Sequence, residues 1–348
     1  MFKQAPILPP VAQPFVGTIN HPDVYIWDAW TCLEGTRIHL YCLAVPRRFG
    51  EREIRPSERN QFAFHIRHFT SEDQGVSWVD RGAFLQTTDA NSNIWSGSML
   101  AEPDGPISAY TKTIWEEPDH PFVQSICVGR SVNFDSYEGS GFTVISDPIR
   151  DRKAIIEAGY YLADPGEIGS KDGEEGGPIL AWRDPFLFKH RTEIEVIWCA
   201  KTAPSIPAIA RARLEQRQDG FFGVELLPPI RLPDAAEFTQ AELPKIWKDN
   251  STGCFMLLVS ACNRQHEHQP DSEVFKEMRL YVSEDVSGPW KAWSTSTSRV
   301  EFPPNAFGVS PYLWDASGDG FTSIVPLTEQ ATSGEPLSML TNVQISLR

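Results

Sequence analysis

The residues Pro178–His190, PILAWRDPFLFKH, contain the stretch Trp182-Arg183-Asp184-Pro185-Phe186, in which a charged pair stands inside an apolar segment. Apolar residues on both sides predict a buried strand that a charged pair interrupts. Burying Arg183 and Asp184 uncompensated costs several kcal/mol, so the two groups are matched to each other or face a wet cavity. Pro185 removes a ladder donor, which makes this an edge strand or an irregular one. The segment is therefore a candidate site or a structural Arg–Asp ion pair.

The rest of the chain favours short strands joined by turns. It has 348 residues with 28 Pro, 24 Gly and 11 Trp, and no stretch of twelve or more carries a helical apolar stripe. Alternating or β-branched and aromatic-rich segments predict strands at Arg37–Val45, Phe62–Thr70, Ile107–Thr113, Phe122–Val128, Glu193–Cys199, Ala208–Leu214, Phe255–Ser260, Met278–Ser283, Phe321–Val325 and Asn342–Leu347.

A loose repeat suggests how these strands are grouped. Aromatic-rich strands that carry a polar residue recur around Asp28, Trp95, Asp184, Glu242 and Tyr312. Intervals of roughly 50 to 90 residues fit the four-stranded blades of a β-propeller. We therefore expect an all-β, five-bladed β-propeller: one catalytic domain over residues 1–348, with residues 1–20 as an N-terminal extension. Two packed sandwich domains are the alternative, but the sequence contains no linker between domains.

Charge and composition limit the partners. The formal charge of −15 argues against nucleic acid and anionic membranes, which both select a cationic surface. The N-terminus has no apolar segment typical of a signal peptide, and no later run approaches a transmembrane span. We therefore expect a cytoplasmic protein. The oligomeric state is not predicted.

The cysteines and histidines do not form a metal-binding pattern. The six cysteines have no C-x-x-C spacing, and most lie in strand-like segments such as HLYCLAV and VIWCAKT, so we expect buried free thiols rather than disulfides or a zinc site. His266 and His268 lie in a polar loop, where solvated side chains are expected. No metal and no cofactor are predicted.

Three acids stand in segments that suit carbohydrate chemistry. Asp28 lies between Trp27 and Trp30, in a ring-lined setting typical of sugar sites, although an Asp there can also cap a turn. Glu242 precedes Leu243 and Pro244 in a strand-like run, where an ordinary solvated Glu is the alternative.

Together with Asp184, these acids supply the groups for glycosyl transfer. One carboxylate attacks the anomeric carbon or activates water, a second protonates the leaving oxygen, and a third supports the charged transition state. Trp95 and Ser96, in the WSGS segment, add an aromatic wall and a hydroxyl that can hold a sugar.

The motifs resemble those of glycoside hydrolase family 68, the levansucrase, inulosucrase and β-fructofuranosidase group, over about residues 20 to 345. In the family's order they are WDAW, HFTSEDQGVSW, WSGS, WRDP, ELP, RLYVSEDVSGPWK and NAFGVSPYLW. The resemblance implies a five-bladed propeller and a retaining enzyme that acts on sucrose or related β-fructofuranosides, including fructans, by hydrolysis or transfer.

The resemblance also implies roles for particular residues. Asp28 matches the nucleophile, Asp184 the transition-state stabiliser and Glu242 the general acid/base. The remaining matches are to residues that bind substrate: Trp27, Trp95, Ser96 and Arg183 in the fructosyl pocket, and Arg264 near an arginine that contacts the leaving glucose.

Two positions depart from the family pattern. Gln240 stands where the family has an acidic residue, and we count it among the substrate-binding residues; Leu243 stands where the family has Arg. Both lie on the leaving-group side. The fructosyl site is therefore better supported than sucrose as the particular donor.

Three other functions are compatible with parts of the sequence. The segment Ser71–Trp78 fits the S-x-D-x-G-x-x-W turn of sialidases, but one copy indicates a folding element, and no arginine cluster with a Tyr nucleophile accompanies it. Inverting arabinanases and xylosidases also use three acids on five-bladed propellers. A carbohydrate-binding propeller without turnover is the non-enzymatic alternative.

Overall fold

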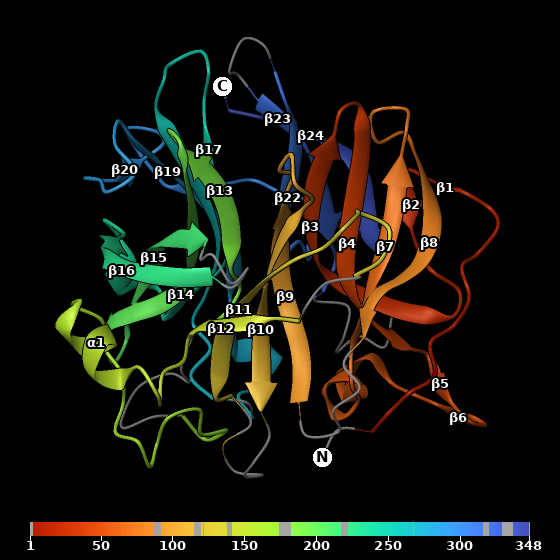
Figure 1. Ribbon diagram of the computed structural model, residues 1–348, viewed down its shortest axis with the longest axis horizontal. Coiled ribbons are helices and arrows are strands. Elements are labelled where there is room, and N and C mark those ends of the chain that lie inside the picture. The colour runs from red at the N-terminus through yellow and green to blue at the C-terminus, as the bar shows by residue number, and fades with distance from the viewer. Residues whose placement is uncertain are drawn as a thin grey trace. The chain divides into compact units, whose positions relative to one another are not determined.

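The structure, a computed structural model, describes residues 3–86, 92–114, 120, 122–137, 141–173, 182–216, 222–266, 268–315, 320–328 and 337–347. Strands dominate, which confirms the all-β class. They form five sheets of four or five strands, whose strands are labelled in Figure 1. By fold class these sheets are the blades of a five-bladed β-propeller. All ten strands predicted from the sequence are present, with ends that differ by a few residues.

The first two sheets come from the N-terminal half of the chain. The first has the order β1-β8-β7-β4-β3, from β1 (Phe15–Val16), β3 (Val24–Glu34), β4 (Arg37–Pro46), β7 (His65–Ser71) and β8 (Ser77–Gln86). The second has the order β12-β11-β10-β9, from β9 (Ser92–Leu100), β10 (Ile107–Ile114), β11 (Gln124–Arg130) and β12 (Thr143–Ser146).

The other three sheets follow the same plan. The third comprises β13 (Phe186–His190), β14 (Glu193–Ala203), β15 (Ile206–Gln216) and β16 (Phe222–Arg231). The fourth comprises β17 (Gln240–Lys248), β18 (Phe255–Cys262), β19 (Lys276–Ser283) and β20 (Lys291–Ala292), with β21 (Arg299–Val300) paired to β19. The fifth has the order β2-β24-β23-β22, from β2 (Thr18–Ile19), β22 (Ser310–Trp314), β23 (Gly320–Pro326) and β24 (Met339–Ser346).

Short elements complete the described residues. The hairpin of β5 (Arg48–Phe49) and β6 (Arg52–Glu53) stands apart from the five sheets. The helical segments are the α-helix α1 (Arg152–Glu157) and the 3-10 helices Pro56–Gln61, Ala235–Glu237 and Asp271–Glu273. None of the helices in these ranges is both long and apolar enough to cross a membrane.

The polar residues picked out by the sequence repeat lie at sheet edges. Asp28 is on β3, Trp95 on β9, Glu242 on β17 and Tyr312 on β22, and each of these strands is the edge of its sheet. The sequence repeat therefore marks the first long strand of each of these blades.

The stretch around Asp184 differs in part from its prediction. Trp182–Pro185 are not in a strand, and β13 begins only at Phe186, because Asp184 has a left-handed φ of 61° and Pro185 cannot donate to a ladder. Strand β13 is the edge of its sheet, as expected from Pro185. The apolar residues 178–181, predicted as the start of this strand, lie outside the described residues.

The chain divides into two compact units, each with a buried core of its own. The first unit comprises Met1–Ile107, Arg130–Ser140 and Phe302–Arg348, and the second comprises Ser108–Gly129 and Gly141–Glu301. Whether residues 1–348 act as a single domain stays a prediction.

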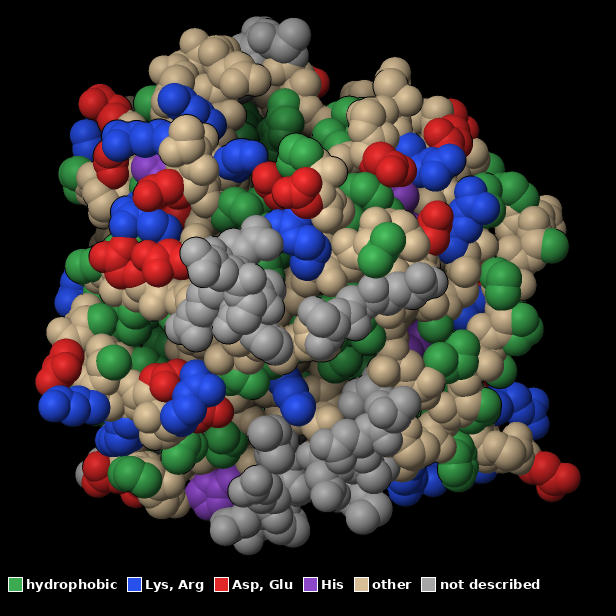
Figure 2. Space-filling model, in the orientation of Figure 1, with side chains coloured by type: hydrophobic (Ala, Val, Ile, Leu, Met, Phe, Trp, Pro, Cys, Tyr) green, Lys and Arg blue, Asp and Glu red, His purple; other side chains and the backbone are tan. Residues whose placement is uncertain are grey.

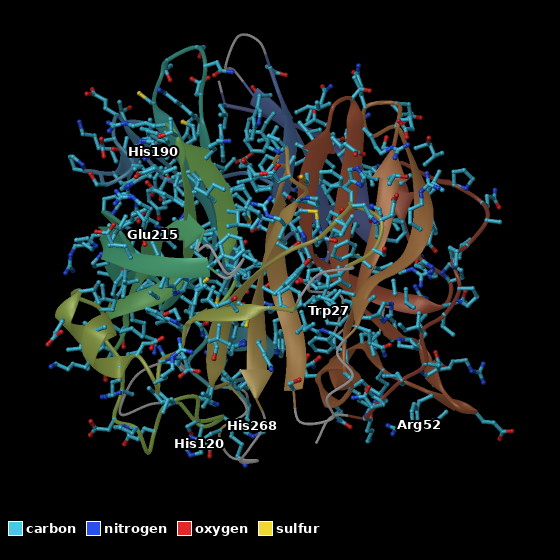
Figure 3. All side chains as sticks on the ribbon, viewed as in Figure 1. Trp27, Arg52, His120, His190, Glu215 and His268 are labelled. Atoms are coloured by element: carbon cyan, nitrogen blue, oxygen red, sulfur yellow. The ribbon has the colours of Figure 1, made fainter. Side chains whose placement is uncertain are left out.

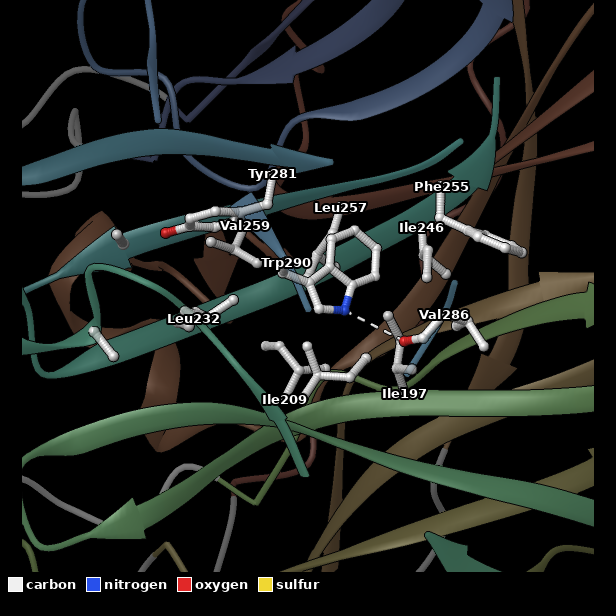
Figure 4. Packing of buried hydrophobic residues seen from close by; sticks show 14 of the residues in the cluster. Ile197, Ile209, Leu232, Ile246, Phe255, Leu257, Val259, Tyr281, Val286 and Trp290 are labelled. Carbon is white, nitrogen blue, oxygen red and sulfur yellow. Dashed lines mark hydrogen bonds between the residues drawn. The ribbon is translucent and has the colours of Figure 1, made fainter. Parts of the chain in front are cut away.

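The two cores are built from the inner faces of the strands. In the first unit, side chains from the first and fifth sheets pack together, among them Ile26, Leu40 and Ile324, each fully buried. In the second, the Trp290 indole lies among Ile197, Ile209 and Leu257 and donates to the Val286 carbonyl at 3.3 Å (Figure 4). Burying one such side chain stabilises the fold by about 1.5–3 kcal/mol.

The N-terminal residues are held in the first unit. Strand β1 pairs with β8, and β2 pairs with β24, so the segment expected as an extension supplies two short strands. The buried guanidinium of Arg67 donates to the carbonyls of Leu8 and Pro9 at 2.7 and 2.8 Å and pairs with buried Asp80. Asp80 in turn accepts the Val11 amide at 2.7 Å.

Two turns with similar chemistry follow the third strand of a blade. In Ser71–Trp78, Asp73 accepts from the Ser77 amide and hydroxyl, and the Trp78 indole donates to the Gly75 carbonyl at 3.0 Å. The segment Ser283–Trp290 repeats the pattern with Asp285, which accepts from the Ser287 amide and hydroxyl. The second segment has Ser287 where the S-x-D-x-G-x-x-W motif has Gly, so the single copy counted from the sequence stands; the two segments share their Ser-Glu-Asp start and closing Trp.

The first of these turns predicts a destabilising substitution. Gly75 has φ +88°, and a Cβ there would stand 2.2 Å from the Tyr312 hydroxyl oxygen. Gly75→Ala should therefore lower the free energy of unfolding by roughly 2–4 kcal/mol, through strain and steric overlap. Gly35→Ala is the matched control, because Gly35 has φ +60° but open space around its Cβ, and should cost about 1 kcal/mol. Urea unfolding of both variants checks this, and equal losses would contradict the role of Tyr312.

Buried histidines predict a loss of stability in acid. Burial, and then the positive charge of Arg67, lowers the pKa of His65 to about 3, and burial holds the pKa of His68 well below its ordinary value. Below about pH 6.5 these two histidines therefore bind protons in the unfolded chain while they stay neutral in the folded chain. The free energy of unfolding should fall as pH drops from about 6.5 towards 3, by about 1.4 kcal/mol per unit for His65 alone. Urea titrations at several pH values should show a shallower slope in His65→Gln; an unchanged slope would rule out His65 as a source.

The surface carries charges of both signs, and the cysteines are free. Acidic and basic side chains are interspersed on the face shown in Figure 2. All six cysteines are free and five of them are buried, as predicted; Cys254 is partly exposed.

Candidate active site

Asp28 lies in a β-bulge of the edge strand β3. Trp27 pairs with Leu43 and Ala29 with Cys42, so the register shifts at Asp28, whose φ is 46°. A bulge leaves one residue out of the ladder and re-aims its side chain. The left-handed conformation costs a non-glycine residue about 1–2 kcal/mol, and Asp is among the residues that tolerate it best.

An aromatic row lies in the same unit as Asp28. Phe64 contacts Trp27 and Trp95 edge to face, with ring centroids 4.9 Å apart in each pair. Trp27, labelled in Figure 3, is buried, as is Ser96 on β9. Phe64 was not selected from the sequence, because one phenylalanine in an apolar run carries no signal of its own; it links the two predicted tryptophans.

Asp184 is held from three directions in the second unit. Its amide donates to the Thr111 hydroxyl at 2.8 Å, and its Oδ2 accepts the Leu243 amide at 3.1 Å. The Cys199 thiol donates to the same oxygen at 3.3 Å. The carboxylate is buried, and all three of these neighbours come from other strands, so the sequence around Asp184 did not reveal them.

Glu242 lies at a second β-bulge. It pairs with Ser260, but the next pair is Lys245 with Leu258, and Leu243 between them has φ 50°. The bulge turns the Leu243 amide towards Asp184, as the hydrogen bond shows. Asp184 is therefore hydrogen-bonded to the backbone of the residue that directly follows Glu242.

Arg183 joins these two acids. Its guanidinium lies 3.2 Å from Glu242 Oε1 and 3.8 Å from Asp184 Oδ2. Burial lowers the pKa of Arg183, but the Glu242 and Asp184 carboxylates outweigh burial and hold that pKa above its ordinary value. The buried pair expected from the sequence is thus a matched triad, and the arginine reduces the repulsion between the acids.

Gln240 and Arg264 lie beside the triad. The Gln240 side chain is fully buried, accepts from the Arg183 guanidinium and donates to the Arg264 carbonyl at 3.1 Å. The Thr239 hydroxyl donates to the same carbonyl at 2.9 Å. Gln240 therefore ties Arg183 to the backbone of the loop that carries Arg264.

Left-handed backbone occurs at or beside each of the three predicted acids. Seven non-glycine residues in the described ranges have a positive φ: Asp28, Asp184 and Leu243, the residue after Glu242, together with Gln74, Arg191, Asn305 and Asn342. The first three lie in or just before the first long strand of a sheet. Strained non-glycine backbone persists only where the surroundings enforce it, and it gathers at functional sites.

The structure thus groups the predicted residues in two sets. Trp27, Asp28, Trp95 and Ser96 belong to the first unit, while Arg183, Asp184, Gln240, Glu242 and Arg264 lie together in the second. The described residues contain no cluster of three or more His, Cys, Asp or Glu side chains able to hold a metal ion.

The sequence matches no protein-family model and no curated protein. Solved structures do resemble the fold. A Bacillus subtilis levansucrase in complex with oligosaccharides has a TM-score of 0.60 at 12% identity, covering 93% of this chain and 84% of its own. A levansucrase complexed with sucrose gives 0.62 at 13%, with 94% and 85% covered. A Bombyx mori family 32 β-fructofuranosidase in complex with sucrose gives 0.61 at 14%, with 94% and 61% covered. By fold, this chain is a β-propeller of the kind found in levansucrases and β-fructofuranosidases.

Proposed function

We propose that the chain is a retaining, fructosyl-transferring glycoside hydrolase that acts on sucrose or related β-fructofuranosides. The observation that carries the proposal is the strained backbone at or beside each of the three acids, Asp28, Asp184 and Glu242. The family motifs in their order support it. So does the fold, which is shared with proteins solved in complex with sucrose and oligosaccharides.

Each acid has one role in the proposed reaction. Asp28 attacks the anomeric carbon of the fructosyl unit and forms an ester, while Glu242 gives its proton to the leaving oxygen. Glu242 then takes a proton from water or from a sugar hydroxyl, which displaces Asp28 and restores the starting configuration. Asp184 stabilises the positive charge that develops on the sugar ring in both steps.

The neighbouring residues bind and orient the substrate in this proposal. Trp95 is partly exposed and offers a ring face for the fructosyl unit, whereas Trp27 and Ser96 are buried. Arg183, held between two carboxylates, keeps Glu242 in one orientation. Gln240 and Arg264 belong to the leaving-group side, where a neutral amide replaces the family's acidic residue. A cytoplasmic location stays a prediction.

Product analysis tests the proposed activity. The protein is incubated with sucrose, with fructan oligomers, and with arabinan and xylan oligomers, beside an Asp28→Asn control. We expect glucose from sucrose in the parent protein alone. Equal free fructose indicates hydrolysis, and less free fructose than glucose indicates transfer. Cleavage of arabinan or xylan but of no fructoside would instead support the inverting family, and binding without products would support a carbohydrate-binding propeller.

A further inference from the structure

Three buried cysteines occupy corresponding places beside the three acids. Cys42 lies on β4, Cys199 on β14 and Cys262 on β18, each the second strand of its sheet. The edge strand next to each carries, or directly follows, one candidate acid. All three side chains are at most 1% exposed. The family motifs of the sequence analysis include none of these positions.

Cys199 and Asp184 are in contact through their side chains. The Cys199 amide donates to the Arg183 carbonyl at 2.8 Å, one residue out of the register of the β13–β14 pairs, which end at Phe186 with Ile197. This bond places Cys199 against Arg183 and Asp184, and its thiol donates to Asp184 Oδ2 at 3.3 Å.

Cys262 contacts Glu242 diagonally across the pair of strands β17 and β18. Cys262 pairs with Gln240, and Glu242 pairs with Ser260, so the thiol and the carboxylate project from the same face two residues apart. The Cys262 thiol donates to Glu242 Oε1 at 3.4 Å.

Cys42 completes the pattern in the first unit. It pairs with Ala29 at the bulge, so Asp28 and Ala29 together oppose it. Burial raises the pKa of the Cys42 thiol; the Arg67 charge opposes this rise, and the Asp80 and Asp28 carboxylates add to it.

The thiols of the other two pairs stay protonated. Burial first, and then the neighbouring acid, raises the pKa of Cys199 through Asp184 and the pKa of Cys262 through Glu242. Each sulfur is therefore an S–H donor, and a thiol is a weaker donor than a hydroxyl or an amide. Such a donor adds a direction-dependent contact to the carboxylate while withdrawing little of its charge.

We propose that Cys199 and Cys262 are positioning residues whose S–H groups orient the Asp184 and Glu242 carboxylates, with Cys42 in the corresponding place beside Asp28. The catalytic meaning of this orientation rests on the proposed function, but the orientation itself can be measured without turnover.

A carboxyl titration tests the Cys262 contact directly. Other groups also act here: Glu242 contacts Arg183, Asp184 lies beside the same guanidinium, and Lys276 acts on the Cys262 thiol. Protein labelled with ¹³C in glutamate carboxyls is titrated by NMR, with the Glu242 signal assigned from its loss in Glu242→Gln. A hydroxyl stabilises the carboxylate more than a thiol does, and a methyl group less. We expect the midpoint to fall in Cys262→Ser and to rise in Cys262→Ala.

A matched control and a second pair keep the test decisive. Cys127→Ser introduces a hydroxyl at another buried thiol, on β11, and should leave the Glu242 midpoint unchanged. Cys199→Ser and Cys199→Ala, followed at the Asp184 carboxyl, repeat the measurement if a Cys262 variant does not fold. The same midpoint in all Cys262 and Cys199 variants would overturn the proposal.

Kinetics separate this proposal from the proposed function. With a fructoside substrate, the alkaline limb of kcat/KM should move to lower pH in Cys262→Ser and to higher pH in Cys262→Ala. Ordered titration midpoints without turnover of any fructoside would leave the positioning role standing and refute the fructosyl activity. Turnover of a fructoside with unchanged titration midpoints and an unchanged alkaline limb would support the fructosyl activity and refute the positioning role.

Discussion

Asp28→Ala is expected to abolish turnover with every fructoside, by roughly 10⁴-fold or more in kcat. The substitution removes the group that forms the ester, and neither a better leaving group nor more substrate can replace it. The effect should therefore be the same for sucrose and for an activated donor. Initial rates with both substrates measure it.

The left-handed backbone conformation at Asp28 determines which variants are suitable controls. Because Asp28 has φ 46°, Asp28→Asn is the better-folded version of the test: Asn tolerates this conformation and keeps the side-chain shape but has no nucleophilic charge. Arg191→Ala makes the parallel change at another left-handed residue, φ 60°, in the turn between β13 and β14, and should leave turnover intact. Turnover of Asp28→Asn within tenfold of the parent protein would exclude Asp28 as the nucleophile.

Glu242→Ala is expected to cost roughly 10²–10⁴-fold in kcat with sucrose, where the leaving sugar needs a proton. Fructosyl fluoride needs no such proton, so the first step should recover with this donor, and the loss in kcat/KM should shrink at least tenfold. The comparison uses kcat/KM for glucose release and for fluoride release, because kcat with the fluoride is limited by the second step, which needs Glu242 as base.

A variant that keeps the Arg183 triad in place separates loss of the acid from loss of the ion pair. Glu242→Gln retains an oxygen for the Arg183 guanidinium, which lies 3.2 Å from Glu242 Oε1, and should show the same dependence on the donor. Glu225→Gln, at an exposed ion pair with Arg213, is the control for loss of a carboxylate elsewhere. Equal losses in kcat/KM with sucrose and with fructosyl fluoride would show that Glu242 is not the acid.

Much of the fold could be predicted from the sequence because strand periodicity is a local signal. Arg37–Val45, for example, begins with polar and apolar residues in alternation and continues as an apolar run, and it forms β4 almost residue for residue. The five polar-aromatic segments likewise lie at or next to sheet edges. Each combines buried aromatic rings with one polar side chain that needs a polar setting. Strands β1 and β2 were missed because two residues each are too few for a period.

The candidate site was predictable by residue type but not by geometry. Asp184 stands out in an apolar run, yet the groups that hold it, Thr111, Cys199 and the Leu243 amide, come from three other segments of the chain. The bulges at Asp28 and Leu243 depend on strand register, which a single sequence does not reveal. The thiols beside the acids were likewise expected only as buried cysteines.

Trapping the covalent intermediate tests the central claim, that Asp28 is the nucleophile. Glu242→Gln is mixed with fructosyl fluoride, which can form the ester without an acid but cannot discharge it quickly without a base. The mixture is quenched in acid, digested and mapped by mass spectrometry. The account predicts one fructosyl group on the peptide that contains Asp28, and none when Asp28→Asn is added. A fructosyl group on Asp184 instead, or release of product of inverted configuration with no ester formed, would contradict it.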